Sequence, residues 1–267
     1  MWKSLLSTTL IALIAAAPAT NNPKPLTRAH AHNDYEHPRP LLDALDNGFG
    51  SVEADVHLIA GHLLVAHDPR ELRPDRTLQS LYLDPLKKRI ADNAGHVYPA
   101  GPATFYLMID VKSDAPSTYT ALKDALVPYH DLLTVFENDK TRPGPITVII
   151  SGNRDRATMK SEPTRHAALD GTLSDLTATP SPPASLVPWV SAPWTKSFKW
   201  KGEGQIPADE LAKLKHLADQ AHTQHRQLRF WDAPDNPTTW QVLYSANVDL
   251  INTDHLKECA QFLATQP

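Results

Sequence analysis

Residues 51–58 read SVEADVHL, and this stretch decides the fold because polar and apolar side chains alternate along it. Successive side chains of a β-strand point to opposite faces, so Glu53, Asp55 and His57 share one face and apolar residues share the other. Such a strand is either an edge strand whose polar face meets water or a barrel strand whose acids point inward. Inward acids must be paired or must bind a metal to offset their desolvation.

A second stretch, residues 105–112 with the sequence FYLMIDVK, repeats this pattern. Asp110 and Lys112 fall on one face at the end of the predicted strand, where they form either a structural ion pair or part of a site. Catalytic residues of (β/α)8 barrels lie at the carboxyl ends of the strands, so Glu53, Asp55 and Asp110 are expected to converge there. Three carboxylates offer hard oxygen ligands, which predicts Mg²⁺ or Ca²⁺ as the cofactor.

The rest of the chain predicts an α/β protein, because short apolar runs alternate with helical patterns. Eight strands are expected, at residues 26–32, 52–59, 105–112, 146–151, 165–169, 187–192, 228–232 and 250–253. Helical patterns lie at residues 40–47, 78–94, 117–133, 154–162, 208–225, 237–246 and 254–264. This alternation favours a single-domain (β/α)8 TIM barrel, a fold that typically takes about 250 residues. A doubly wound open sheet is the alternative, although no GxGxxG follows any predicted strand.

Local signals refine the ends of these elements. Gly61 predicts a turn that folds residues 62–67 back as an extra strand beside the second one. Ser117 and Asn236 are predicted N-caps of helices, and Pro237 follows Asn236 at the first helical position. Both signals concern the connections of the predicted barrel and leave its strand order unchanged.

The composition excludes several classes of protein. The chain has 267 residues, of which 41% are hydrophobic and 21% charged, a balance typical of a globular domain rather than a disordered chain or a membrane bundle. Its net charge of -4 gives no basic excess for binding nucleic acid. Cys259 is the single cysteine, so neither an intrachain disulfide nor a CxxC metal site can form.

The first residues predict export. Residues 1–19 read MWKSLLSTTLIALIAAAPA, in which Lys3 precedes an apolar core shorter than the ~20 residues of a membrane span. Ala17-Pro18-Ala19 resembles a small-x-small cleavage site. We expect a signal peptide over 1–19, a barrel domain over 20–267, and a secreted or periplasmic protein; an uncleaved membrane anchor is the alternative.

Histidines gather near the predicted strand ends. The chain has 13, and six of them fall between His30 and His67. His30 and His32 end the first strand, in AHAHND, and His67 ends the hairpin partner, in LLVAHDP. The imidazole pKa lies near working pH, so two histidines beside three acids can serve as general base and general acid.

These residues carry a resemblance to a known superfamily. The order His32, Glu53-x-Asp55, His67-Asp68 and Asp110-x-Lys112 resembles glycerophosphodiester phosphodiesterases and phosphatidylinositol-specific phospholipases C. Residues 30–68, HAHNDYEHPRPLLDALDNGFGSVEADVHLIAGHLLVAHD, look like the opening of its secreted bacterial and fungal branch. Residues 228–254, LRFWDAPDNPTTWQVLYSANVDLINTD, are similar to its last two strands. The resemblance is least specific between residues 113 and 185.

The resemblance assigns roles to individual residues. It implies that His32 and His67 are the catalytic pair, and that the metal ligands are Glu53, Asp55 and Asp110. Four neighbours of the site are predicted to bind substrate: Lys112 at the phosphate, Trp231 in the pocket wall, Asn252 in the matching last strand, and His30, which points inward.

Two departures from the family pattern bear on the substrate. The usual His-Arg-Gly is His32-Asn33-Asp34 here, which removes an arginine that helps to hold the phosphate. The usual glutamate of the third strand is Asp110, as in the related spider-type phospholipase D branch. The acid trio is kept, so the metal-free bacterial phosphatidylinositol phospholipases are a poorer match.

The resemblance thus implies a metal-dependent phosphodiester hydrolase that uses two histidines for general acid–base catalysis. Its expected substrate is a glycerophosphodiester or a phospholipid-type phosphodiester. The expected partners are therefore a small-molecule or lipid substrate, with transient contact to a membrane surface and without nucleic acid.

Other functions compete with this interpretation. His30-Ala31-His32 and Asp254 resemble the zinc site of amidohydrolases, although the predicted sixth strand lacks the histidine that this family needs. Paired carboxylates in a barrel also fit a glycosidase, which leaves the histidines unexplained. A secreted non-catalytic ligand-binding barrel is the third alternative, with an apolar rim built from Trp189, Trp194, Phe198 and Trp200.

Overall fold

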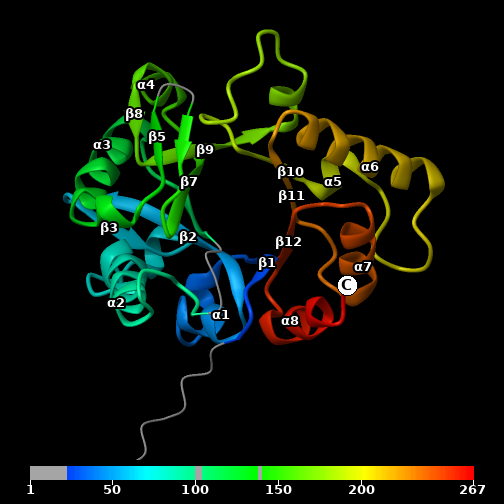
Figure 1. Cartoon of the computed structure of the whole chain (residues 1–267), viewed down its shortest axis with the longest axis horizontal. Helices are drawn as coiled ribbons and strands as arrows, with labels where there is room; N and C mark the ends of the chain where they lie inside the picture. The colour runs from blue at the N-terminus through cyan, green and yellow to red at the C-terminus, as the bar shows by residue number, and fades with distance from the viewer. Residues whose placement is uncertain (1–22, 100–103, 138–139) are drawn as a thin grey trace, which may run out of the picture.

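The computed structural model describes residues 23–99, 104–137 and 140–267 and forms a closed barrel (Figure 1). Eight parallel strands build it: β1 (Leu26–Ala31), β2 (Phe49–Ile59), β4 (Phe105–Val111), β7 (Ile146–Gly152), β9 (Ala167–Thr172), β10 (Trp189–Pro193), β11 (Gln227–Trp231) and β12 (Leu250–Thr253). The sheet closes because β1 pairs in parallel with both β2 and β12. The predicted TIM barrel is therefore confirmed, and the open-sheet alternative is wrong.

The helices form an outer layer around this barrel (Figure 1). They are α1 (Leu42–Asp46), α2 (Asp84–Asp92), α3 (Ala115–Leu126), α4 (Arg156–Ser161), α5 (Trp194–Ser197), α6 (Ala208–Thr223), α7 (Pro237–Ser245) and α8 (Leu256–Ala264). Short turns extend this layer: 3₁₀ turns η1 (Asp34–Glu36), η2 (Pro69–Glu71), η4 (Val127–Leu132) and η5 (Leu173–Leu176), and the π-turn η3 (Gln79–Leu83). Within the described parts of the chain, none of the helices is long and apolar enough to cross a membrane.

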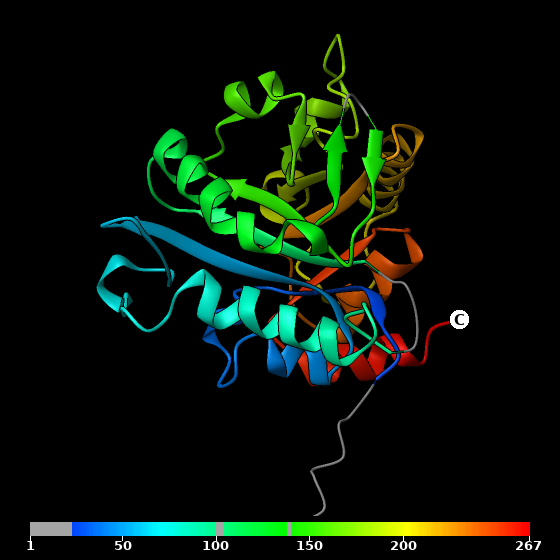
Figure 2. The same cartoon turned by 60° about the vertical axis from the view of Figure 1, so that its left-hand side comes forward.

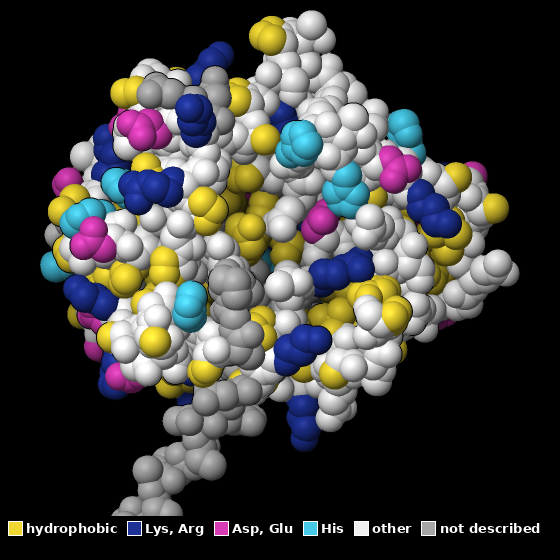
Figure 3. Space-filling model, in the orientation of Figure 1, with side chains coloured by type: hydrophobic (Ala, Val, Ile, Leu, Met, Phe, Trp, Pro, Cys, Tyr) yellow, Lys and Arg dark blue, Asp and Glu magenta, His cyan; other side chains and the backbone are white. Residues whose placement is uncertain are grey.

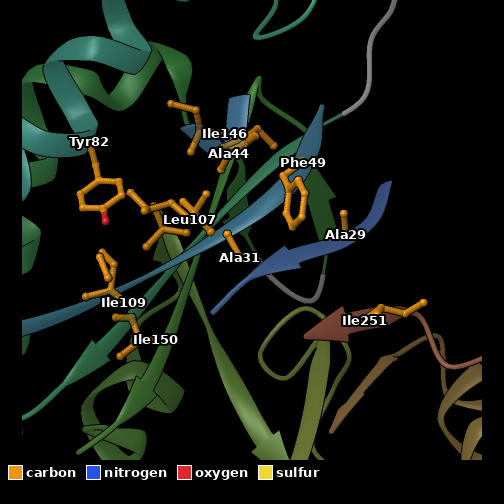
Figure 4. Packing of buried hydrophobic residues seen from close by; sticks show 14 of the residues in the cluster. Ala29, Ala31, Ala44, Phe49, Tyr82, Leu107, Ile109, Ile146, Ile150 and Ile251 are labelled. Atoms are coloured by element: carbon orange, nitrogen blue, oxygen red, sulfur yellow. The ribbon is translucent and has the colours of Figure 1, made fainter. Parts of the chain in front are cut away.

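Alternation along the strands divides the buried side chains into two groups, one between the barrel and the helices and one inside the barrel. Outward side chains of the strands pack under the helices, as Figure 4 shows for Ala31, Leu107 and Ile150 among others. Burying each Leu or Ile side chain in this layer stabilises the fold by about 1.5–3 kcal/mol. Inward side chains near the amino ends of the strands fill the interior: Met108, Ile149, Ala168, Trp189 and Leu250. On each of these strands a polar inward residue follows two positions after the apolar one, so the polar residues meet at the carboxyl end of the barrel.

The strand register aligns these polar residues across the sheet. Asp55 of β2 is paired with Asp110 of β4, and Asp110 is paired with Ser151 of β7. A one-residue slip would turn every one of these side chains to the other face. The register therefore places the polar positions of three consecutive barrel strands in one layer.

An extra strand at the edge of the barrel sheet and one small separate sheet are added to the barrel. The predicted hairpin exists as β3 (His62–Val65), which pairs antiparallel with the end of β2 and projects beyond the barrel (Figure 2). A small antiparallel sheet was not predicted and consists of β5 (Val135–Glu137), β6 (Lys140–Arg142) and β8 (Thr164–Arg165). Its strands have two or three residues each, too few to show a period in the sequence.

The helix N-caps give one confirmation and one correction. Asn236 caps α7, because its side chain accepts a hydrogen bond from the backbone N–H of Thr239. Ser117 is not an N-cap: α3 begins two residues before it, and the carboxylate of Asp114 accepts from the Ser117 N–H. A carboxylate at this position is favoured by the helix dipole, and Pro116 fits the first turn. The predicted signal peptide over 1–19 lies outside the described residues.

Asp34 makes the stability of the fold depend on pH. Its carboxylate is buried beside β2 and accepts hydrogen bonds from the Leu41 N–H and the Tyr82 hydroxyl, but burial outweighs them and raises its pKa to about 7. In the unfolded chain the pKa is about 4. Between these values the unfolded chain ionises while the folded protein holds the proton, so the free energy of unfolding falls as pH rises from 4 to 7, by up to about 4 kcal/mol.

We expect Asp34→Asn to remove this dependence. Chemical denaturation of wild type and variant at pH 4, 5.5 and 7 measures the free energy of unfolding directly. The variant should lose less stability than wild type over this range, even where the buried amide lowers its stability at every pH. Parallel curves for the two proteins would contradict the role of Asp34.

Candidate active site

A cavity of about 520 Å³ opens at the carboxyl ends of the barrel strands. Six of the predicted site residues line it: His32, Glu53, His67, Asp110, Lys112 and Trp231. They come from β2, β4 and β11 and from the segments that follow β1 and β3. The closed barrel therefore brings together residues that are up to 199 positions apart in the chain, as His32 and Trp231 are.

Three carboxylates form the centre of the cavity. One oxygen from each of Glu53, Asp55 and Asp110 lies within 4.8 Å of the others. Glu53 is 4% exposed and Asp55 is fully buried, yet Oδ1 of Asp55 has no hydrogen-bond partner among the described residues. A buried carboxylate oxygen without a donor is costly unless a cation meets it. The cluster can thus hold a metal ion, and its all-oxygen donor set fits a hard divalent cation.

Asp55 is the hub of this cluster through its other oxygen. Oδ2 accepts from the Tyr35 hydroxyl at 2.8 Å and from His67 Nδ1 at 2.8 Å, and it lies 3.0 Å from Lys112 Nζ. Burial, followed by the charge of Asp55, raises the pKa of Tyr35, so its hydroxyl keeps its proton and donates. All three donors meet one oxygen, which leaves Oδ1 facing the other acids.

Asp110 completes the cluster from the neighbouring strand. Burial raises its pKa to about 6, because the nearby acids Glu53 and Asp55 add to burial and Lys112, 3.3 Å away, only partly offsets it. Gly152 of β7 passes so close that a Cβ there would overlap Asp110 Oδ1, and its φ of +66° also favours glycine. The backbone of β7 therefore forms the wall behind Asp110.

His32 is oriented by a carboxylate from the last strand. Its Nδ1 lies 2.8 Å from Asp254 Oδ1, and since a carboxylate only accepts, Nδ1 carries the proton. Burial opposes the charged imidazole, but this hydrogen bond and the negative charges of Glu53 and Asp254 together outweigh burial and raise the pKa of His32. Nε2 is thereby left as the atom that can exchange a proton.

His67 has the same arrangement on the other side of the cluster. Its Nδ1 donates to Asp55 Oδ2 at 2.8 Å, and its side chain is 59% exposed. Both imidazoles therefore hold their Nδ1 proton against a carboxylate and keep Nε2 free. One of them shares its carboxylate with the acid cluster, which ties the position of His67 to that of Asp55.

Glu53 is held by residues beneath the cavity. Oε2 accepts from His30 Nε2 at 3.2 Å and from Arg229 Nη2 at 3.0 Å. Burial alone would raise the pKa of Glu53, but the charge of Arg229 and the hydrogen bond from His30 lower it well below its ordinary range. His30 itself is fully buried, and burial lowers its pKa to about 4, so it is neutral.

The predicted substrate contacts of His30, Asn252 and Trp231 divide into two groups. His30 has no exposed surface and Asn252 accepts from Arg229 Nε at 2.9 Å, so both support Arg229 and Glu53 from below the cavity wall. Trp231 lies in the wall and is 42% exposed. Contact of any of these residues with substrate stays a prediction, but only Trp231 is placed in the open cavity.

The far wall carries a polar group that the sequence analysis missed. Asp170 accepts from the Ser191 hydroxyl at 2.7 Å and the Ser151 hydroxyl at 3.1 Å, and burial raises its pKa. Arg154 donates to the backbone carbonyl of Asp170. Alternation along β7, β9 and β10 would have indicated these inward polar positions, because each follows an apolar inward residue by two.

Arg229 was not assigned a role from sequence, and Asp254 was named only as part of the alternative amidohydrolase-like zinc site. Arg229 lies two residues before Trp231 on the inward face of β11, so the same alternation rule would have indicated it. Its pairing with Glu53 could not be read in this way, since the two residues are 176 positions apart. Asp254 follows the last strand, and only the closed barrel brings it to His32.

The geometry argues against two alternative functions, the amidohydrolase-like zinc hydrolase and the ligand-binding barrel with an aromatic rim. Among the described residues, the acid cluster is the group suited to a metal, and it contains no histidine, unlike the amidohydrolase zinc site. The aromatic residues proposed as an apolar rim are core residues: Trp194 stacks on Phe198 with ring centroids 4.1 Å apart, and Trp189 is fully buried inside the barrel.

Comparison with known proteins identifies a family. The sequence model of the AIM6-like phosphodiesterase domain matches residues 20–169. The chain is 30% identical to the altered inheritance of mitochondria protein 6 homolog of Arthroderma benhamiae, over 84% of this chain and 80% of that protein. It is 31% identical to altered inheritance of mitochondria protein 6 of Eremothecium gossypii, over 93% of this chain and 72% of that protein.

Two solved structures share the fold. A glycerophosphodiester phosphodiesterase from Agrobacterium tumefaciens superposes with a TM-score of 0.53 at 15% identity, covering 90% of this chain and 100% of that one. The phosphatidylinositol-specific phospholipase C from Listeria monocytogenes gives 0.51 at 10% identity, covering 94% and 97%. The likeness to these two proteins is one of fold, and the sequence comparisons identify the family: the chain belongs to the AIM6-like phosphodiesterase domain family.

Proposed function

We propose that this protein is a metal-dependent phosphodiester hydrolase in which His32 and His67 exchange protons with the substrate. The observation that carries the proposal is the symmetry of the two imidazoles. Each holds its Nδ1 proton against a carboxylate, Asp254 or Asp55, and leaves Nε2 available beside the acid cluster. Membership of a phosphodiesterase family supports phosphodiester cleavage as the reaction.

Glu53, Asp55 and Asp110 are the residues that would hold the metal. When bound, a divalent cation of the Mg²⁺ or Ca²⁺ type supplies positive charge that stabilises a phosphate oxygen in the transition state. Lys112 adds a second positive charge from the protein, and although burial opposes it, Asp110 and Asp55 raise its pKa and keep it protonated. Lys112 thereby takes part of the role of the missing arginine after His32.

The two histidines divide the proton transfers between them. One imidazole takes the proton of the attacking hydroxyl, from water or from a neighbouring alcohol of the substrate, and the other gives a proton to the leaving oxygen. Asp254 stabilises the protonated form of His32, so the pair can hold one proton in the resting enzyme. After each turnover the base carries an extra proton and the acid lacks one. Exchange with water removes the first proton and replaces the second, so the proton count balances.

The cavity supports a small-molecule phosphodiester as substrate. A volume of about 520 Å³ accommodates a head group, and Trp231 offers an apolar surface at its wall. The substrate we propose is a glycerophosphodiester or a phospholipid-type phosphodiester, with transient contact of Trp231 to a lipid surface. Figure 3 shows Lys and Arg side chains scattered among acidic ones on one face of the molecule, without a continuous basic patch for nucleic acid. Export by residues 1–19 would place the activity outside the cytoplasm.

Loss of either histidine should abolish most of the activity. We expect His32→Ala and His67→Ala each to lower kcat on a generic aryl phosphodiester by about 10²- to 10⁴-fold, because general acid–base catalysis contributes that much. Steady-state assays with added Mg²⁺ or Ca²⁺ measure the effect. His96→Ala, at an exposed histidine that does not line the cavity, is the control and should retain full activity. Undiminished turnover in both site variants would refute the catalytic pair.

Removing the metal or a ligand should have parallel effects. Chelation should stop hydrolysis, and readdition of a divalent ion should restore it, because the acid cluster alone supplies only negative charge to the phosphate.

Glu53→Gln should weaken metal binding by at least about 100-fold, the upper range for loss of a residue that merely supports a ligand. Isothermal titration calorimetry measures the binding, with the exposed Glu71→Gln as control. Unchanged metal affinity in Glu53→Gln would refute the ligand assignment.

Asp254→Asn should move one limb of the pH profile. The hydrogen bond from Asp254 raises the pKa of His32, so its removal lowers that pKa and shifts the corresponding limb of kcat/KM to lower pH. The limb that belongs to His67 should stay in place, because Asp254 does not contact it. A profile with both limbs unmoved would show that Asp254 does not set the protonation of His32.

A further inference from the structure

Two donors hold a single oxygen of Glu53. His30 Nε2 and Arg229 Nη2 both bind Oε2, at 3.2 Å and 3.0 Å, and we call this pair the Glu53 clamp. Among the described residues no hydrogen bond reaches Oε1, so that oxygen keeps its lone pairs for a cation. As long as the clamp is closed, Glu53 can offer one oxygen to a metal and not two.

The clamp is itself fixed by buried partners. The Glu53 carboxylate can only accept, so His30 Nε2 carries the proton, and the unprotonated Nδ1 accepts from the Ser51 hydroxyl at 2.7 Å. Arg229 donates Nε to Asn252 Oδ1 at 2.9 Å and Nη1 to the sulfur of Met108 at 2.7 Å. These partners lie on barrel strands and are largely buried, so Glu53 cannot rotate its carboxylate without breaking several hydrogen bonds.

Asp55 is restricted in the same way. Tyr35, His67 and Lys112 all meet Oδ2, and Oδ1 is buried without a partner. Lys112 also lies 3.3 Å from Asp110 Oδ1. That ion pair is not a hydrogen bond, and Asp110 Oδ1 is buried without a hydrogen-bond partner in the described part of the chain. Glu53 and Asp55 therefore each have one oxygen held by donors and one oxygen left, whereas neither oxygen of Asp110 is held in this way.

The number of carboxylate oxygens free to bind a cation favours one of two hard cations over the other. Ca²⁺ takes six to eight oxygen ligands in flexible geometry and commonly uses both oxygens of a carboxylate. Mg²⁺ is smaller, demands a regular arrangement of about six oxygens, and is bound through one oxygen of each of one or two carboxylates, with water and substrate phosphate completing the set. Glu53 and Asp55, each restricted to one oxygen, fit the binding mode of Mg²⁺ and disfavour the paired-oxygen binding that Ca²⁺ uses.

We propose that the Glu53 clamp, together with the donors on Asp55, keeps the acid cluster from binding through paired oxygens and so makes the site select Mg²⁺ over Ca²⁺. His30 and Arg229 are positioning residues in this scheme, since they act through Glu53. The inference rests on the proposed metal dependence of the enzyme and specifies which ion that metal is.

Direct titration of the two ions tests the selection. The full-length protein, stripped with chelator, is titrated by calorimetry with MgCl₂ and separately with CaCl₂, and the ratio of the two dissociation constants is the readout. Wild type should bind Mg²⁺ more tightly. Arg229→Met opens the clamp and should weaken Mg²⁺ binding by about 10- to 100-fold, as loss of a ligand's supporting partner does, with a smaller loss for Ca²⁺. The ratio should therefore move toward Ca²⁺.

A matched control separates this effect from general loss of a buried arginine. Arg226 is 3% exposed, as Arg229 is, but it bonds to Ser181 and the Pro182 carbonyl, away from the acid cluster. Arg226→Met should leave the Mg²⁺/Ca²⁺ ratio unchanged. Arg229→Lys keeps the charge but places all its donors on a single nitrogen, and it should recover part of the selectivity.

A second pair of variants keeps the test valid if Arg229→Met does not fold. Tyr35→Phe removes one donor from Asp55 Oδ2 with little change in shape, and it should shift the ratio toward Ca²⁺ by less than Arg229→Met does. Tyr98→Phe is its control, because the Tyr98 hydroxyl is equally buried but donates to the Phe49 carbonyl.

The outcomes distinguish the two levels of the proposal. If wild type binds neither ion, the proposed metal dependence fails and this inference fails with it. If wild type binds Ca²⁺ as tightly as Mg²⁺, or if the ratio is unchanged in Arg229→Met and in Tyr35→Phe, the selection is refuted while metal-dependent hydrolysis stands. A shift that appears equally in Arg226→Met or Tyr98→Phe also refutes it.

Discussion

The burial of two carboxylates inside the barrel is the constraint on which the rest of the site depends. Glu53 is 4% exposed and Asp55 is fully buried, and removing an unpaired carboxylate from water costs several kcal/mol. The protein offsets this cost with donors from four segments: Arg229, His30, Lys112 and Tyr35. Their positions explain why the interior changes from apolar to polar halfway along the strands.

The same compensation prepares the site for chemistry. In Glu53 and Asp55 the donors engage one oxygen and leave the other without a hydrogen bond from the described residues, so neutralising these acids also orients them. His67 is both a donor to Asp55 and a proposed acid–base group, which couples the position of the imidazole to the cluster. A site arranged in this way needs little reorganisation when substrate enters, which is how preorganised electrostatic sites stabilise a transition state.

Much of this arrangement was predictable because it follows from local rules. The two-residue alternation in residues 51–58 and 105–112 predicted Glu53, Asp55 and Asp110, and all three lie together. The N-cap at Asn236 followed from its side chain and the next proline, whereas Ser117 misled because Asp114 three residues earlier competes as a better cap. The small sheet of β5, β6 and β8 escaped because its strands are too short to show a period.

The alternation of the strands, the single-domain barrel and the chemical groups at the strand ends could all be inferred from the residues in their order. Which of these groups meet depends on the closed barrel: Arg229 with Glu53, Asp254 with His32, and Tyr35 with Asp55. Alternation is a property of neighbouring residues, whereas partners across a barrel depend on register and closure. His30 shows the difference, because its inward direction was predictable but its role as a buried partner of Glu53 was not.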